Sequence, residues 1–105
     1  MNALEVLESR RSDIEALCRK YGVARLRLFG SALRSDWDPN SSDFDFLAEF
    51  GPPPAGLNLF KQLFCFAADI EEALGRRVDV VDWNAARKPH FNKIAEAEAQ
   101  EWYAA

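Results

Sequence analysis

Two aspartates inside an apolar stretch constrain this chain more than any other feature. Asp43 and Asp45 alternate with two phenylalanines in the run DFDF. Because alternate side chains of a strand point to opposite faces, the two carboxylates share one face and the two rings share the other. Carboxylates about 7 Å apart on one face repel each other, and a bound divalent cation relieves that repulsion. The spacing suits Mg²⁺, although a bare Asp-x-Asp pattern also fits a solvated strand face.

A glycine–serine pair ends an earlier alternating segment, residues 25–29. Gly30 allows the backbone to approach a ligand closely, and Ser31 opens a helical turn whose N–H groups and hydroxyl can hold phosphate oxygens. The alternative is a simple strand-to-helix turn in which Ser31 is the helix N-cap. The pair therefore adds candidate phosphate ligands shortly before the two aspartates.

A third aspartate, Asp79, lies within the apolar run Val78–Val81. An aspartate in so apolar a strand needs a partner, and on a neighbouring strand it could reach a cation held by Asp43 and Asp45. An edge-strand position would also explain it. Asp82 is a rival candidate, but loop chemistry at the end of the strand accounts for it.

The hydrophobic periodicity predicts an α/β (α+β) fold, with a small mixed sheet packed with helices. Asn58 is expected to cap one helix, Gly75 to end it, and Pro89 to open the last helix. The expected elements, in chain order, are a helix over about 3–21, a strand over 25–29, a short helical turn over 32–37, a strand over 43–50, a rigid loop over 51–56, a helix over 58–74, a strand over 77–81 and a helix from 89 to about 103.

The length and composition limit the classes of function. The 105 residues, 49% of them hydrophobic, are expected to form one domain over 1–105. The net charge of −4 argues against a basic nucleic-acid surface over the whole molecule. The N-terminus has no apolar signal core, and no run approaches the ~18 apolar residues of a membrane span. Cys18 and Cys65 lack C-x-x-C spacing and lie in apolar helical patterns, so they are expected as buried free thiols in a cytoplasmic protein.

Together the three motifs resemble those of the DNA polymerase β-type nucleotidyltransferase superfamily, and most closely its minimal nucleotidyltransferase group. The motifs are Phe29-Gly30-Ser31, Ser42-Asp43-Phe44-Asp45-Phe46 and Val78-Asp79-Val80, and the resemblance covers nearly the whole chain. The loop between Ser31 and Asp43 has eleven residues, one more than the commonest spacing. After the Gly-Ser pair, many members have Ala-Arg-Gly where this chain has Ala32-Leu33-Arg34.

The resemblance implies magnesium-dependent transfer of a nucleotide, AMP from ATP, by a two-metal mechanism. It implies that Asp43 and Asp45 bridge two Mg²⁺ ions, and that Asp79 binds the catalytic ion and helps to deprotonate the attacking hydroxyl. The Gly-Ser pair would hold the β- and γ-phosphates of ATP. Arg34 would take the place of the family's arginine, shifted by one position.

The resemblance also implies a partner. The chain has no room for the acceptor-binding domain of the larger relatives, so the acceptor is expected to be a macromolecule or to bind an open face. Minimal nucleotidyltransferases are commonly paired with a small helical HEPN-domain protein, often a toxin, which the antitoxin adenylylates, binds, or both. One alternative is an interaction module that docks without catalysis. A second alternative is transfer of a nucleotide to an RNA end, and the acidic balance of the chain argues against it.

Three residues near the motifs have more than one possible role. Trp37 lies in the loop between the two halves of the motif, where it could pack locally or stack on a base. Arg76 and Arg77 flank the third expected strand and could lie near phosphates. The nucleotide base and the oligomeric state, homo-oligomeric or hetero-oligomeric, are open as well.

Overall fold

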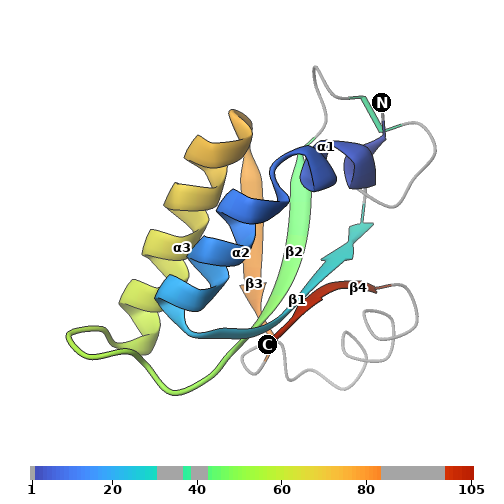
Figure 1. The fold of residues 1–105 in the computed structure, drawn as a ribbon. Coiled ribbons are helices and arrows are strands. Elements are labelled where there is room, and N and C mark those ends of the chain that lie inside the picture. The colour runs from blue at the N-terminus through green and yellow to red at the C-terminus, as the bar shows by residue number, and fades with distance from the viewer. Residues whose placement is uncertain (1, 31–36, 39–42, 84–98) are drawn as a thin grey trace.

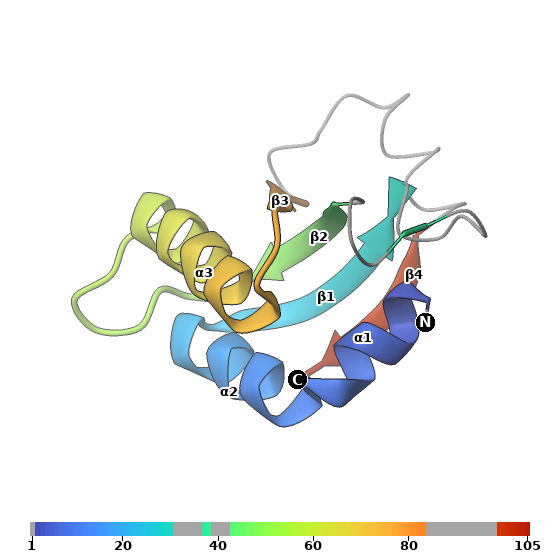
Figure 2. The same ribbon diagram turned by 90° about the horizontal axis from the view of Figure 1, so that it is seen from above.

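The architecture is a four-stranded sheet with helices on one face (Figure 1, Figure 2). The computed structural model describes residues 2–30, 37–38, 43–83 and 99–105. The strands lie in the order β3-β2-β1-β4, and their bounds are β1 Val23–Phe29, β2 Phe44–Phe50, β3 Val78–Asp82 and β4 Gln100–Ala104. β2 pairs antiparallel with β1 and parallel with β3, so the predicted mixed sheet is confirmed.

The helices in the described ranges are α1 (Ala3–Ser9), α2 (Arg11–Tyr21) and α3 (Leu59–Leu74). α2 and α3 lie next to each other across the same face of the sheet (Figure 2). None of the helices in these ranges is long and apolar enough to cross a membrane.

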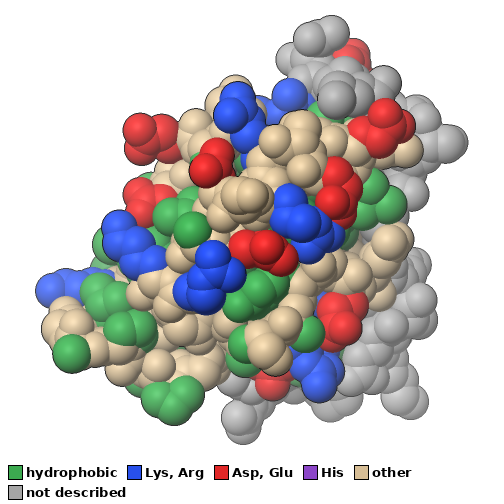
Figure 3. All heavy atoms as spheres, viewed as in Figure 1, with side chains coloured by type: hydrophobic (Ala, Val, Ile, Leu, Met, Phe, Trp, Pro, Cys, Tyr) green, Lys and Arg blue, Asp and Glu red, His purple; other side chains and the backbone are tan. Residues whose placement is uncertain are grey.

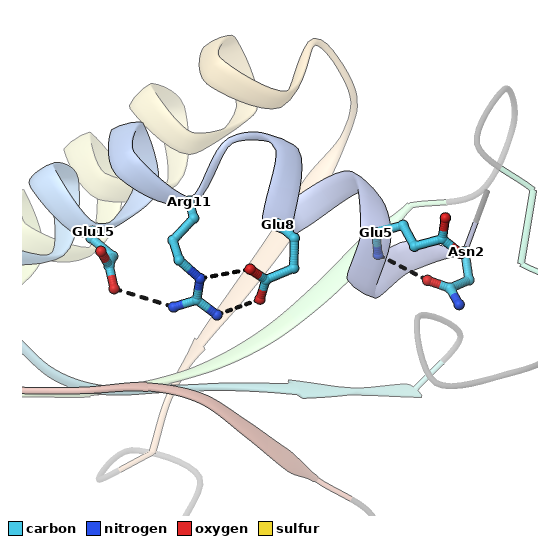
Figure 4. A network of polar contacts seen from close by, with 5 residues as sticks. All are labelled: Asn2, Glu5, Glu8, Arg11 and Glu15. Atoms are coloured by element: carbon cyan, nitrogen blue, oxygen red, sulfur yellow. Dashed lines mark hydrogen bonds and ion pairs between the residues drawn. The ribbon is translucent and has the colours of Figure 1, made fainter.

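The single helix predicted at the N-terminus is two helices, because the chain turns at Arg10, where φ is −119° and ψ is 19°. Arg11 braces this turn by donating hydrogen bonds to Glu8 in α1 and, at 3.2 Å, to Glu15 in α2 (Figure 4). The Arg11 guanidinium also lies 4.2 Å from the ring centre of Trp102 in β4. One side chain therefore ties both helices to the sheet.

The side chains of β1 and β2 alternate between the two faces of the sheet. On the face beneath the helices, Leu26, Phe44 and Phe46 are fully buried. On the opposite face, Asp45 and Arg27 are partly buried and Leu47 is fully buried. The helices contribute to the core chiefly Ile14 and Cys18 of α2 and Phe66 and Ile70 of α3. The predicted separation of carboxylates from rings along β2 is thus present in the structure.

The ends of α3 are as the sequence predicts. The Oδ1 atom of Asn58 accepts a hydrogen bond from the backbone N–H of Lys61 at 2.9 Å, and Gly75 ends the helix with a φ of +66°. The buried stripe of α3 is Gln62, Phe66, Ile70 and Leu74. Cys65 lies off this stripe and is exposed, so the prediction of a buried thiol is wrong for Cys65 and confirmed for Cys18. Burial raises the pKa of the Cys18 thiol to about 12.

A strand replaces the end of the last predicted helix. Residues 100–104 form β4, whereas the sequence predicts a helix that continues to about residue 103; the earlier part of that helix, 89–98, lies outside the described residues. β4 pairs antiparallel with β1, with Tyr103 opposite Leu26, and it buries Trp102. Hydrogen bonds along the edge of β1 therefore outweigh the helix propensity of this alanine-containing segment.

Candidate active site

The carboxylates of Asp45 and Asp79 come from matching positions on adjacent strands. β2 and β3 run parallel, and their register pairs Asp45 with Asp79. Neighbouring strands are about 4.8 Å apart, and residues in register point to the same face of the sheet. Asp79 is exposed and Asp45 is half-buried, so neither is sealed from solvent. The parallel pairing of β2 with β3 thus brings together two of the three aspartates that the sequence singles out.

Asp43 immediately precedes β2, and its backbone is held from both sides. The indole Nε1 of Trp37 donates a hydrogen bond to the Asp43 carbonyl oxygen at 3.0 Å. The next residue, Phe44, donates its backbone N–H to the carbonyl oxygen of Arg77 at 3.1 Å. Asp43 is half-buried and stands two positions before Asp45. Asp43 therefore lies just before the start of β2, close in the chain to Asp45, and its backbone is fixed there by two hydrogen bonds.

Gly30 lies against the carboxylate of Asp45, because Phe29 at the end of β1 pairs with Asp45 in the antiparallel register. A Cβ atom at Gly30 would stand 2.7 Å from the Oδ2 atom of Asp45, so the Asp45 carboxylate would have to move to make room for a side chain. Gly30 also has a φ of +66°, a conformation that favours glycine. Both the positive φ and the contact with Asp45 thus favour glycine beside the carboxylate pair.

The donor set fits Mg²⁺ only together with ligands from a substrate. Within the described ranges, no group of three or more His, Cys, Asp or Glu side chains is placed to hold a metal ion. Mg²⁺ usually binds one or two protein carboxylates and takes its other ligands from water and substrate phosphates. The neighbouring carboxylates of Asp45 and Asp79, with the close approach that Gly30 allows, meet this requirement. Ser31 and Arg34 lie outside the described residues, as does most of the short turn expected after Gly30.

Trp37 and Arg76 support the site in a way that the sequence does not reveal. Trp37 is only 6% exposed, and its ring centre is 4.9 Å from that of Phe44, so it packs in the core and its ring is not presented to a base. The Arg76 guanidinium lies 5.1 Å from the Trp37 ring centre and 5.6 Å from that of Phe44. The one signal in the sequence is an aromatic residue within an otherwise polar loop, and that signal does not distinguish packing from stacking.

Asp82 is on the other face of the sheet from Asp79. Its register partner is Ala48, which is fully buried on the face beneath the helices together with Phe46. Asp82 is itself 6% exposed. Because Asp79 and Asp82 are three residues apart in one strand, their side chains point in opposite directions. Asp82 therefore does not join the Asp45–Asp79 pair.

The arginines of β1 are engaged with protein groups. Arg27 approaches Glu49 at 3.9 Å and lies 4.9 Å from the ring centre of Trp83. Arg25 lies between Glu49 and Glu101, at 3.9 and 3.8 Å. The prediction of a solvated strand face holds for Arg25, which is half exposed, but not for Arg27, whose side chain is only 16% exposed. Both guanidinium groups therefore lie against other groups of the protein.

The sequence matches the pattern of the nucleotidyltransferase domain family over residues 11–101. It is 35% identical over 82 residues to the Methanocaldococcus jannaschii protein named "Putative protein adenylyltransferase MJ0435". The alignment covers 78% of this chain and 82% of that protein. A second protein of this organism, "Putative protein adenylyltransferase MJ0128", is 32% identical over 94 residues, covering 90% of this chain and 91% of the relative.

Solved structures share the fold. A structure reported as that of a "putative minimal nucleotidyltransferase" has a TM-score of 0.72 and 31% identity, and the match covers 95% of both chains. A chain of a toxin–antitoxin structure solved with AMP-PNP has a TM-score of 0.66 and 20% identity, covering 90% of this chain and 73% of that chain. A chain of the toxin–antitoxin MntA-HepT structure has a TM-score of 0.62 and 17% identity. That match covers 93% of this chain and 73% of the MntA-HepT structure's chain. These matches confirm the resemblance read from the three motifs: the chain belongs to the nucleotidyltransferase domain family, as a minimal nucleotidyltransferase with the polymerase β-type fold.

Proposed function

We propose that this nucleotidyltransferase transfers AMP from Mg²⁺-ATP to a hydroxyl group of a partner protein. The observation that carries the proposal is the pairing of Asp45 with Asp79 across β2 and β3, with Gly30 against the Asp45 carboxylate. The names of the two Methanocaldococcus jannaschii relatives support a protein as the acceptor. The likeness to a chain of a structure solved with AMP-PNP supports an adenine nucleotide as the donor.

The residues have separate tasks in this proposal. Asp43, Asp45 and Asp79 would hold Mg²⁺ together with the substrate phosphates, and Asp79 would also help to deprotonate the attacking hydroxyl. Gly30 and Ser31 offer backbone N–H groups and a hydroxyl to the β- and γ-phosphates. Bound Mg²⁺ supplies electrostatic stabilisation of the attacking and leaving oxygens. The hydroxyl then displaces pyrophosphate in line at the α-phosphate, and the protein contributes position and charge and forms no covalent intermediate.

Arg34 is proposed as an additional ligand of the leaving pyrophosphate. The place of Arg34, three residues after the Ser31 of the Gly-Ser pair, supports this assignment, because a guanidinium close to the pair could neutralise phosphate charge. The neutral variant Arg34→Gln should raise the KM for ATP more than it lowers kcat.

The acceptor we propose is a helical toxin of the HEPN type, with this chain as its antitoxin. The fold likeness to chains of the MntA-HepT toxin–antitoxin structures motivates this choice. Adenylylation of the toxin would then neutralise it. In the alternative function, an interaction module, the chain would neutralise the toxin by docking alone. The two differ in whether the aspartates are needed.

The test is transfer of label from α-labelled ATP to the co-expressed partner. The wild-type chain should label the partner only with Mg²⁺, and Asp43→Asn/Asp45→Asn should not label it. Asp13→Asn, which removes an exposed carboxylate from α2, is the matched control and should label normally. A double variant that still neutralises the toxin without labelling it would establish docking and overturn the proposal.

A further inference from the structure

The exposed large hydrophobic side chains of the described residues all lie at the beginning of α3. They are Leu59, Phe60 and Phe64, which are 50%, 66% and 59% exposed. The rings of Phe60 and Phe64 contact each other, with centres 4.3 Å apart. We call these three residues, two of which are aromatic, the aromatic patch. Figure 3 shows hydrophobic side chains over the beginning of α3 and the loop before it, and acidic side chains over the end of the helix. Exposed aromatic rings on one face mark an interaction surface.

A groove lies on the other end of the same helix. It has a volume of about 540 Å³ and is lined by Ala68, Glu71, Glu72, Gly75, Arg76 and Arg77. Positions 60, 64, 68, 71 and 75 are spaced by three or four residues, so the two rings of the patch share one face of α3 with the groove, whereas Leu59 is in line with the buried stripe. At 1.5 Å per residue, their centres are about 15 Å apart along the helix.

We propose that a second copy of this chain packs against α3, with the two helices antiparallel about a two-fold axis. In this arrangement the aromatic patch of each copy enters the groove of the other. A two-fold interface uses the same surface on both copies, and it therefore needs a projection and a matching hollow on one face. The structure provides both on a single helix.

The charges on α3 favour the antiparallel arrangement. Lys61 is exposed beside the patch, and Glu71 and Glu72 are exposed beside the groove. Antiparallel packing brings Lys61 of one copy towards the two glutamates of the other, whereas parallel packing would bring like charges together. Arg77, also exposed at the groove, offers a cation to an entering aromatic ring.

The dimer leaves the candidate active site open, because α3 covers one face of the sheet and Asp45 lies on the other. The interface is small. α3 has 16 residues and is about 24 Å long, and one face of such a helix is less than the roughly 800 Å² per partner of a standard interface. We therefore expect a weak dimer that forms with increasing protein concentration.

Analytical ultracentrifugation over a series of concentrations tests the dimer. The wild-type chain should shift from monomer to dimer, and Phe60→Ser/Phe64→Ser should stay monomeric with an unchanged circular dichroism spectrum. Both rings are exposed, so their loss should not unfold the chain. Lys61→Glu should weaken the dimer, and adding Glu71→Lys and Glu72→Lys to it should restore dimerisation. Such rescue requires the two charged groups to meet across the interface.

Cross-linking supplies an independent readout. Cys65 is exposed on α3 between the patch and the groove, whereas Cys18 is buried. A residue near a two-fold axis lies close to its own copy, so a short bis-maleimide should link Cys65 to Cys65 of the second copy in the wild type but not in Phe60→Ser/Phe64→Ser. A chain that is monomeric at every concentration, or a dimer unaffected by these substitutions, overturns the proposal. Loss of toxin binding from the patch variant of a monomeric chain would assign this face to the toxin and would also overturn it.

Discussion

The face of the sheet beneath the helices and the opposite, open face are built from alternate residues of the same strands. In β2, Phe44 and Phe46 are fully buried beneath α2 and α3, whereas Asp45 between them is half-buried on the open face. In β3, Asp79 is on the open face and Asp82 on the covered one. The covered face holds most of the described core, although Leu47 on the open face is fully buried as well, and the open face carries the candidate site. Substitutions on the two faces should therefore separate stability from activity.

The largest loss of stability is expected from Phe46→Ala. The ring is fully buried, and its removal leaves a cavity beneath the helices. The free energy of unfolding should fall by about 3–5 kcal/mol, measured by urea denaturation. Activity per folded molecule should stay near the wild-type value. A loss below about 1 kcal/mol would show that this face does not carry the fold.

Asp79→Asn should have the opposite effect. Asp79 is exposed, so the free energy of unfolding should change by less than about 0.5 kcal/mol. The rate of label transfer should fall on the order of 10²- to 10³-fold, because a charged ligand at the reacting centre is lost. Asp13→Asn should leave the rate of label transfer unchanged and should lower the free energy of unfolding by less than about 1 kcal/mol, because it removes an acidic side chain from the first turn of α2. An active Asp79→Asn variant would remove Asp79 from the site.

Gly30→Ala should lower both stability and activity, because it acts on the backbone conformation and on the position of the Asp45 carboxylate together. The matched control is Gly75→Ala, since Gly75 has the same φ of +66° but no atom within 4 Å of an added Cβ. Both variants should lose about 1–2 kcal/mol of stability from the left-handed conformation. Only Gly30→Ala should also lose activity, because its Cβ displaces the Oδ2 atom of Asp45. Equal activity of the two variants would separate Gly30 from the site.

Trp37→Phe should have a smaller effect. The substitution keeps an aromatic ring against Phe44 but removes the 3.0 Å hydrogen bond from Nε1 to the Asp43 carbonyl oxygen. We expect a loss of about 1 kcal/mol in unfolding free energy and a few-fold loss of activity from a less well fixed Asp43. The comparison with Trp37→Ala separates the hydrogen bond from the packing, since the alanine variant should lose several times more stability.

The last effect appears only at high pH and concerns the helices that cover the sheet. The Tyr21 hydroxyl of α2 donates a hydrogen bond to Asp69 of α3, and this bond and burial raise the pKa of Tyr21 from 10.0 to about 12. Because the folded pKa is the higher one, this stabilisation is complete below the unfolded pKa and is lost as the pH rises through the folded value. Stability should therefore decline between pH 10 and 12, and Tyr21→Phe should reduce that decline. Urea denaturation across this window measures it, and identical slopes for the two proteins would contradict the assignment.

Local patterns in the sequence predict much of the fold and of the open face. Alternation separates Asp45 from Phe44 and Phe46, and side-chain chemistry identifies the caps Asn58 and Gly75. These features depend on residues that are close in the sequence, and for that reason they can be predicted.

Long-range pairing decides what the sequence does not show. β4 is a strand because the edge of β1 is available to it, although the local composition favours a helix. Cys65 is exposed because the buried stripe of α3 passes through Phe66 and Ile70. The contact between Gly30 and Asp45 depends on the β1–β2 register, and the position of Asp79 beside Asp45 depends on the β2–β3 register.

Calorimetric titration of ATP into the pure chain, with and without Mg²⁺, tests the central claim that the open face holds a metal–nucleotide site. We expect wild type and Asp13→Asn to bind ATP only with Mg²⁺, and Asp43→Asn/Asp45→Asn to show no binding. ATP binding that is the same without Mg²⁺, or that survives in the double variant, would contradict the assignment of these carboxylates.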